Sequence, residues 1–132
     1  MNLKGSNVLV TGAGTGIGKA IAVAMADAGA DVIAADIDVV AARKTADTVT
    51  AKSVRGFAVQ ADCGDVTSIN AMVDTTVAKF GKLDVIVNNA GVTRSAFIME
   101  LTEVEWDRMH RVNAKGVFFC LQGAARLIMQ QN

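Results

Sequence analysis

The chain has 132 residues, 52% of them hydrophobic and 20% charged, and its 13 basic and 13 acidic side chains give a formal net charge of zero. This length and composition fit one globular domain with its own hydrophobic core. The neutral balance excludes charge-driven binding to nucleic acid or to an anionic membrane surface. Apolar runs of about six residues are too short to span a bilayer, and no signal-peptide core precedes the first of them. We therefore expect a cytoplasmic protein without membrane contact.

Short apolar runs alternate with helical patterns along the chain. Strands are predicted at residues 7–11, 31–36, 54–61 and 83–88. Helices are predicted at residues 17–28, 39–49, 66–80 and from Glu103 nearly to the C-terminus, with a bend near Gly116. Asp38 can cap the second helix, and Thr102 with Glu105 forms a capping box before the last one.

The predicted strands are continuous apolar runs, which indicates a parallel sheet buried on both faces by helices. The right-handed crossover rule then gives the strand order 3-2-1-4. We therefore predict an α/β fold, the front half of a Rossmann-type doubly wound parallel sheet, in a single domain over residues 1–132. In the first helix, the side predicted to face the core consists of Ile17, Ala20, Ile21, Ala24 and Ala28.

A glycine-rich turn joins the first strand to the first helix and fits the pattern T-G-x-x-x-G-x-G, through Thr11, Gly12, Gly16 and Gly18. It is not the commoner G-x-G-x-x-G, because Ile17 occupies the place of the last glycine. Glycine lets the backbone approach a bulky anion, and the N-terminus of a helix attracts negative charge. The turn therefore predicts a site for a dinucleotide pyrophosphate, with a plain glycine-rich connection as the alternative.

Three more segments carry polar or small residues that strengthen this interpretation. Asp62 follows the third strand, residues 88–91 read Asn-Asn-Ala-Gly after the fourth, and Asn113 lies in the last helix. Together with the glycine turn, these motifs resemble the short-chain dehydrogenase/reductase family. The resemblance covers the whole chain but only the front half of the family's fold.

Asp36 ends the second strand beside the expected ribose, where a carboxylate accepts hydrogen bonds from two hydroxyl groups. It would repel a 2′-phosphate, and the next residue, Ile37, carries no charge to offset this repulsion. Thr15 is neutral at a position where NADP-preferring relatives commonly carry a basic residue. These residues predict NAD as the cofactor rather than NADP. A solvated acid at a strand end is the alternative for Asp36.

The resemblance implies further contacts with the cofactor. Asp62 would bond the adenine amino group, with Cys63 as its backbone neighbour, although Asp62 could instead cap the following helix, where Asp65 competes. Asn89, Ala90 and Gly91 would present small residues beside the nicotinamide ribose, with a purely structural turn as the alternative.

Asn113 is the only residue of the chain that the resemblance ties to catalysis. In the family, this asparagine anchors a water in a proton relay to a lysine and a tyrosine. Its apolar neighbours, Val112 and Val117, lead us to expect that Asn113 faces a buried site and is hydrogen-bonded. The alternative is an asparagine at a kink of the helix.

The chain contains no tyrosine, whereas the family's Tyr-x-x-x-Lys segment carries its proton transfer. We therefore expect an NAD-dependent oxidoreductase that interconverts a secondary alcohol and a ketone, of which this chain is the cofactor-binding half, truncated before the catalytic segment and inactive alone. A non-catalytic nucleotide-binding or interaction module is the alternative. A fragment of an NADPH-type ketoacyl reductase is a third reading, which Asp36 disfavours.

Two further expectations concern the cysteines and association. Cys63 and Cys120 lie in unrelated segments without a metal-ligand pattern, so we expect reduced, buried thiols and no metal site. The last helix is apolar on more than one face, and the family uses this helix in a dimer contact. A homo-oligomer, dimer or tetramer, is therefore expected through it.

Overall fold

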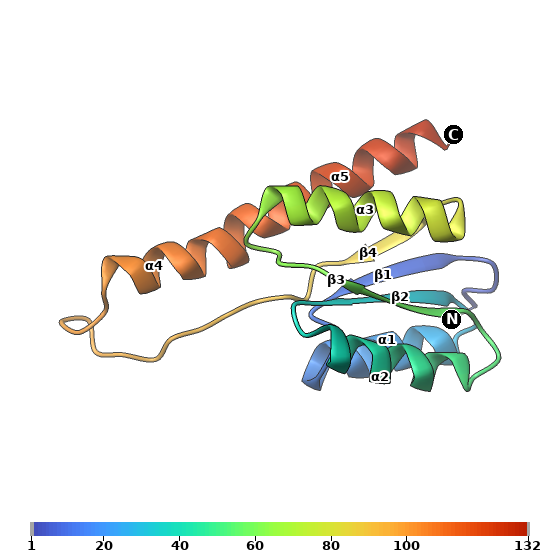
Figure 1. The fold of residues 1–132 in the computed structure, drawn as a ribbon, viewed down its shortest axis with the longest axis horizontal. Coiled ribbons are helices and arrows are strands. Elements are labelled where there is room, and N and C mark those ends of the chain that lie inside the picture. Colours follow the sequence, from blue (N-terminus) through green and yellow to red (C-terminus); the bar gives the residue numbers. More distant parts are fainter. Residues whose placement is uncertain (1, 132) are drawn as a thin grey trace.

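The computed structural model describes residues 2–131 and shows a four-stranded parallel sheet with the order β3-β2-β1-β4. The strands are β1 (Asn7–Thr11), β2 (Asp31–Asp36), β3 (Gly56–Gln60) and β4 (Val85–Val87). Val8 of β1 pairs with Val32 of β2 on one side and with Val85 of β4 on the other. The predicted Rossmann-type sheet and its strand order are confirmed, and the carboxyl ends of all strands lie at one edge (Figure 1).

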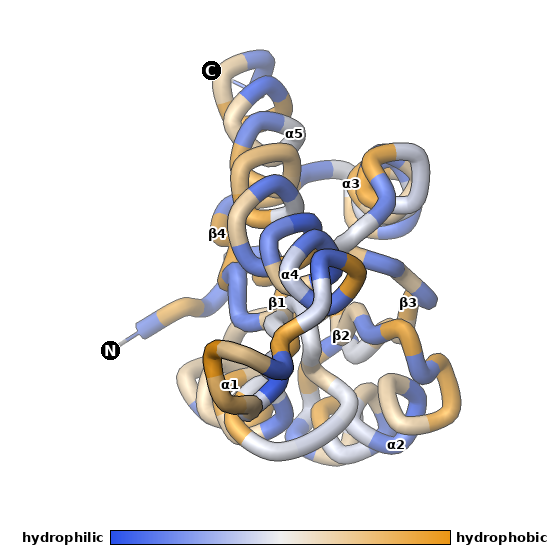
Figure 2. The backbone as a smooth tube through the Cα atoms, turned by 90° about the vertical axis from the view of Figure 1, so that its left-hand side faces the viewer, coloured by the Kyte–Doolittle hydropathy of each residue, from blue (hydrophilic) through white to orange (hydrophobic). Residues whose placement is uncertain are grey.

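Two layers of helices cover the sheet. In Figures 1 and 2, α1 and α2 lie against one face, whereas α3 and α5 lie against the other. The short helix α4 projects beyond the carboxyl edge of the sheet and continues through the π-helical segment η1 into α5. The bounds are α1 Gly16–Asp27, α2 Val39–Thr50, α3 Val66–Phe80, α4 Glu103–His110, η1 Arg111–Gly116 and α5 Val117–Gln130.

Alternate residues of β1 supply the two hydrophobic cores. Leu9 packs with Ile69 and Met72 of α3, whereas Val8 and Val10 belong to the core on the side of α1. All five residues of β1 are buried, as are the four central residues of β2. This arrangement confirms the burial on both faces that the continuous apolar runs predicted.

The side of α1 that faces the core differs from the prediction. Gly18, Ala22 and Ala26 are buried, whereas Ile17 is 75% exposed; Ala20 and Ala24 are exposed as well. The reason is steric, because the glycine turn sets the rotation of the helix and brings its row of small residues against β1. Ile21 is partly buried and packs against this core, so the prediction is confirmed for Ile21 and wrong for Ile17, Ala20 and Ala24.

Several boundaries also differ from those predicted. β3 and β4 are shorter at both ends than the predicted strands, and the single bent helix is three segments, α4, η1 and α5. The predicted caps are confirmed for α2, where Asp38 accepts two backbone hydrogen bonds, and for α4, where Thr102 and Glu105 form a capping box. Asp65 accepts the hydrogen bond from Thr67 N–H that caps α3, so the competing cap is the observed one.

Gly116 joins η1 to α5 where the helix packs against the segment between β3 and α3. A Cβ atom at Gly116 would overlap the carbonyl oxygen of Cys63, a backbone atom that cannot rotate away. We expect Gly116→Ala to lower the free energy of unfolding by about 2–3 kcal/mol, as overpacking does. Urea denaturation followed by circular dichroism measures this change.

Gly123→Ala is the matched control within α5. Its Cβ would meet only the side chain of Val73, at 3.2 Å, and the gain in helix propensity of about 1 kcal/mol offsets a small shift. Equal loss of stability in the two variants would contradict the close approach at Gly116.

Candidate functional site

The glycine turn is packed directly against the end of β4. Gly12 has φ 65° and Gly16 has φ 55°, both in the left-handed region that favours glycine. A Cβ at Gly12 would lie 2.9 Å from the Cα of Ala90, and a Cβ at Gly18 would overlap the carbonyl oxygen of Gly12. Each of the three glycines in the predicted pattern is therefore required, either by a left-handed backbone conformation or by a close contact that leaves no room for a Cβ atom.

Hydrogen bonds from Asn89 and Thr11 hold the turn in this position. The Asn89 Nδ2 donates to the carbonyl oxygens of Thr11 and Gly12, at 3.0 and 3.2 Å. The Thr11 Oγ1 accepts the backbone N–H groups of Asn89 and Ala90, each at 3.1 Å. The side chain of Asn89 thus faces the glycine turn and holds its backbone in place.

Backbone N–H groups fix the carboxylate of Asp36 beside the turn. Its Oδ2 accepts from Gly14 N–H at 2.8 Å, and its Oδ1 accepts from Asp38 N–H at 3.0 Å. A carboxylate has about four acceptor positions, so two remain for a ligand. Within residues 2–131, no lysine or arginine forms an ion pair with this carboxylate.

A cavity of about 490 Å³ lies at the carboxyl edge of the sheet, beneath the projecting α4–η1 segment. It unites most of the residues predicted to bind a cofactor. From the glycine turn and the end of β2 come Gly12, Thr15, Asp36 and Ile37. From the segments after β3 and β4 come Asp62, Cys63, Asn89, Ala90 and Gly91.

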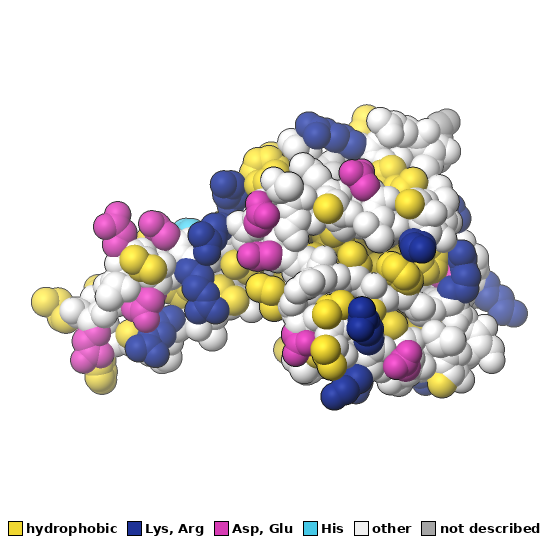
Figure 3. Space-filling model, in the orientation of Figure 1, with side chains coloured by type: hydrophobic (Ala, Val, Ile, Leu, Met, Phe, Trp, Pro, Cys, Tyr) yellow, Lys and Arg dark blue, Asp and Glu magenta, His cyan; other side chains and the backbone are white. Residues whose placement is uncertain are grey.

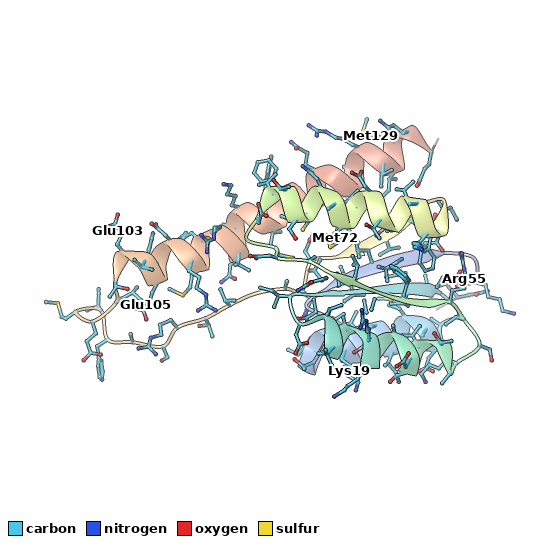
Figure 4. All side chains as sticks on the ribbon, viewed as in Figure 1. Lys19, Arg55, Met72, Glu103, Glu105 and Met129 are labelled. Carbon is cyan, nitrogen blue, oxygen red and sulfur yellow. The ribbon has the colours of Figure 1, made fainter. Side chains whose placement is uncertain are left out.

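Three predicted residues do not line this cavity. Gly16 borders a separate hollow, with Lys19 and Lys44. Figure 4 labels Lys19 among the side chains of α1. Gly18 is buried beneath the Gly12 carbonyl, and the side chain of Ile17 is exposed. Ile17 is therefore outside the cavity and outside the core.

Asn113 lies in η1 and bonds to the segment that follows β4. Its Oδ1 accepts Val92 N–H at 2.8 Å, and its Nδ2 donates to the Val92 carbonyl at 2.7 Å. The expected hydrogen bonding is confirmed, but the expected burial is wrong, because Asn113 is exposed. The backbone of a surface segment, rather than a buried polar group, satisfies the amide.

Asp62 is held in a turn between β3 and α3. Its Oδ1 accepts Gly64 N–H at 2.7 Å, and its backbone N–H donates to Ser68 Oγ at 2.9 Å. Because Asp65 caps α3 instead, the carboxylate of Asp62 remains at the cavity wall.

The two cysteines meet in the structure although they are distant in sequence. Both are buried and free, and they belong to one core cluster. A hydrogen bond from Cys120 lowers the pKa of the Cys63 thiol, although burial acts in the opposite direction. The same hydrogen bond, together with burial, raises the pKa of Cys120. The prediction of buried thiols is confirmed.

Sequence reasoning missed two arginines of the cavity wall. Arg108 lies in the last turn of α4 and Arg111 begins η1, and both line the cavity with Val112. The sequence places both arginines in the predicted helix shortly before Asn113, which is the one feature that could have drawn attention to them. Helical spacing alone does not show which side of that helix covers the cavity.

Among residues 2–131, no helix is long and apolar enough to cross a membrane. No group of three or more histidine, cysteine or acidic side chains in that range could hold a metal ion.

The parallel sheet, the glycine turn against β4 and the acid at the end of β2 define a Rossmann-type domain with its cavity at the carboxyl edge. The short chain dehydrogenase family model matches residues 6–132. The chain belongs to the short-chain dehydrogenase/reductase family. Members of this family are oxidoreductases that use a nicotinamide cofactor, NAD or NADP.

Two curated relatives illustrate the range of the family. The chain is 39% identical over 130 residues to a 2-dehydro-3-deoxy-D-gluconate 5-dehydrogenase of Dickeya dadantii (strain 3937), covering 98% of this chain and 51% of that protein. It is 40% identical over 129 residues to a 3-oxoacyl-(acyl-carrier-protein) reductase of Staphylococcus aureus (strain MW2), covering 95% and 51%. The chain thus spans about half the length of the curated relatives it matches.

A solved structure shows the same arrangement. A short-chain type dehydrogenase/reductase from Mycobacterium marinum superposes with a TM-score of 0.94 at 32% identity, covering 98% of this chain and 53% of that one.

Proposed function

We propose that this chain binds NAD and forms the cofactor-binding half of an oxidoreductase that interconverts a secondary alcohol and a ketone. The observation that carries the proposal is Asp36, whose carboxylate is fixed by the N–H groups of Gly14 and Asp38 at the wall of the cavity. Its free acceptor positions suit the two ribose hydroxyls, whereas its charge disfavours a 2′-phosphate. The neutral neighbours Thr15 and Ile37 leave this charge uncompensated.

The glycine turn and the family resemblance assign the remaining parts of the cofactor. The pyrophosphate lies at the turn, where Gly16 opens α1 and directs free N–H groups toward an anion. Adenine lies beside Asp62 and Cys63, and the nicotinamide ribose lies beside Ala90 and Gly91. Bound NAD supplies the hydride acceptor of the oxidation.

We assign the catalytic role in this chain to Asn113. Its amide bonds both backbone groups of Val92 and so ties η1 to the segment after β4. As the family resemblance implies, it would anchor a water of the proton relay when the rest of the catalytic machinery is present. The chain contains no tyrosine to begin that relay.

Two alternatives remain distinct from this proposal. A non-catalytic nucleotide-binding or interaction module would bind NAD, or a partner, without any turnover in a longer form of the protein. A ketoacyl reductase fragment that prefers NADPH would resemble the Staphylococcus aureus relative in activity, but Asp36 disfavours its 2′-phosphate.

The first test concerns cofactor choice. We expect the chain to bind NAD at least about tenfold more tightly than NADP, because loss of a carboxylate–hydroxyl pair and added repulsion together cost about 1.5–3 kcal/mol. Asp36→Ala should reduce this ratio severalfold, while Asp47→Ala, which removes an exposed carboxylate of α2 outside this cavity, should not. Calorimetric titration with both cofactors measures the ratio, and an unchanged ratio in Asp36→Ala would refute the assignment.

The second test concerns turnover. The 132-residue chain by itself should show no dehydrogenase activity above background, since it lacks a tyrosine general acid that supplies about 10²–10⁴-fold in rate. Absorbance at the NADH band during incubation with alcohols and ketones measures this. Reduction of a ketone by a preparation whose intact mass excludes longer protein would disprove the expectation.

A third part of the proposal is association through the last helix, into a dimer or tetramer. Phe118, Leu121 and Met129 of α5 are 59%, 54% and 78% exposed, and Figure 4 shows Met129 near the end of this helix. β4 is an edge strand of the sheet, with a free row of backbone groups. An apolar helix face beside an open strand edge favours self-association.

We therefore expect the chain to self-associate at micromolar concentration, and Leu121→Glu to weaken this association at least about tenfold by burying a charge at the contact. Val40→Glu is the control, because Val40 is similarly exposed at 56% but lies on α2, on the other face of the sheet. Light scattering distinguishes the two, and a stable monomer in the unchanged chain would contradict the proposal.

A further inference from the structure

Two guanidinium groups line the cavity without a partner. Arg108 and Arg111 come from the end of α4 and the start of η1. Among residues 2–131, neither guanidinium forms a hydrogen bond, an ion pair or a contact with an aromatic ring. Their five N–H donors each are therefore available to a ligand.

Arg111 lies beside Asp62 at one end of the cavity. Both side chains lie next to Gly64: a Cβ atom added to this glycine would lie 3.1 Å from Asp62 Oδ1 and 3.2 Å from Arg111 Nε. The two charged groups nevertheless form no ion pair within 4.0 Å. Asp62 Oδ1 is used by Gly64 N–H, which leaves Oδ2 free. A donor-only group and an acceptor-only group thus flank the same glycine, each with unused bonding capacity.

This pairing matches the chemistry of a neutral purine base better than that of an anion. Adenine presents an amino donor next to ring-nitrogen acceptors, and its π-face accepts a stacked guanidinium. A phosphate in the same place would meet the negative charge of Asp62. The carboxylate of Asp62 therefore disfavours an anionic group beside Arg111, so that hydrogen bonding and stacking are what the guanidinium can contribute.

We infer that Arg111 determines specificity for the adenine base, with Asp62 accepting the amino group and the Arg111 guanidinium contacting the ring. The inference rests on the proposed binding of NAD and assigns Arg111 a contact with the base rather than with the pyrophosphate. Arg108, one turn earlier in the helix, borders the same cavity and is not needed for this contact.

Binding of NAD, ADP-ribose and nicotinamide mononucleotide to the 132-residue chain tests this inference. Arg111→Ala should weaken NAD and ADP-ribose about five- to tenfold, the effect of one lost stacking contact. Nicotinamide mononucleotide has no adenine, so its affinity should stay unchanged. Arg111→Lys should recover less than half of the loss, because an ammonium group lacks the planar fork of arginine.

Arg126→Ala is the matched control. Arg126 is exposed on α5 and is outside the cavity, so its removal should leave all three affinities within twofold. Circular dichroism melting curves of the Arg111 variants should match that of the unchanged chain, since Arg111 is exposed and its side chain forms no ion pair with residues 2–131.

The dependence of NAD affinity on ionic strength distinguishes a contact with the base from a contact with a phosphate. The loss in Arg111→Ala should be the same at low and high salt if the partner is neutral adenine, and should shrink at high salt if the partner is a phosphate. Wild-type-like binding of NAD by Arg111→Ala, or a strongly salt-dependent loss, would overturn the inference and leave the proposed function intact. Failure of the unchanged chain to bind NAD would remove both.

Discussion

The close contact between the glycine turn and the end of β4 determines how the rest of the molecule is arranged. Gly18 lies directly beneath the Gly12 carbonyl, and the Asn89 amide bonds the Thr11 and Gly12 carbonyls. This contact sets the rotation of α1, so that its small residues face β1. It also places Gly14 N–H against the Asp36 carboxylate. A ligand site therefore forms where backbone atoms of three segments approach one another within van der Waals distance.

Charge is distributed unevenly around the cavity. At one end, the Asp36 carboxylate meets only backbone N–H groups, which orient it without neutralising it. Elsewhere on the cavity wall, Asp62 and the guanidinium of Arg111 lie on either side of Gly64. The projecting helix α4 has its acidic residues far from the sheet, as Glu103 and Glu105 show in Figure 4, whereas its cationic end lies over the cavity. This polarity follows the helix dipole, which favours cations at the C-terminal end.

Exposed apolar groups and an unpaired polar atom lie on the β4 and α5 side of the molecule. Asn88 Oδ1 is buried without a hydrogen-bond partner among residues 2–131, immediately after the edge strand β4. The exposed apolar residues of α5 follow the same side of the sheet. Hydrophobic side chains are also exposed on the projecting part of the molecule (Figure 3). In the segment before α4, Phe97, Ile98 and Met99 are exposed. An open strand edge is satisfied by further backbone pairing, which agrees with the proposed association.

The sequence by itself determined the strand order, the glycine turn, the Asp38 and Thr102 caps, and the convergence of most cofactor-binding residues at one edge of the sheet. These features depend on short-range signals, namely apolar runs, capping hydrogen bonds and the order of strands along the chain. Only the tertiary structure decided that Ile17 faces outward, that Asn113 bonds a surface segment, that Cys63 meets Cys120, and that Arg111 lies beside Asp62. Each of these depends on the rotation of a helix or the meeting of distant segments, which is set by packing between elements rather than by the residues of any one of them.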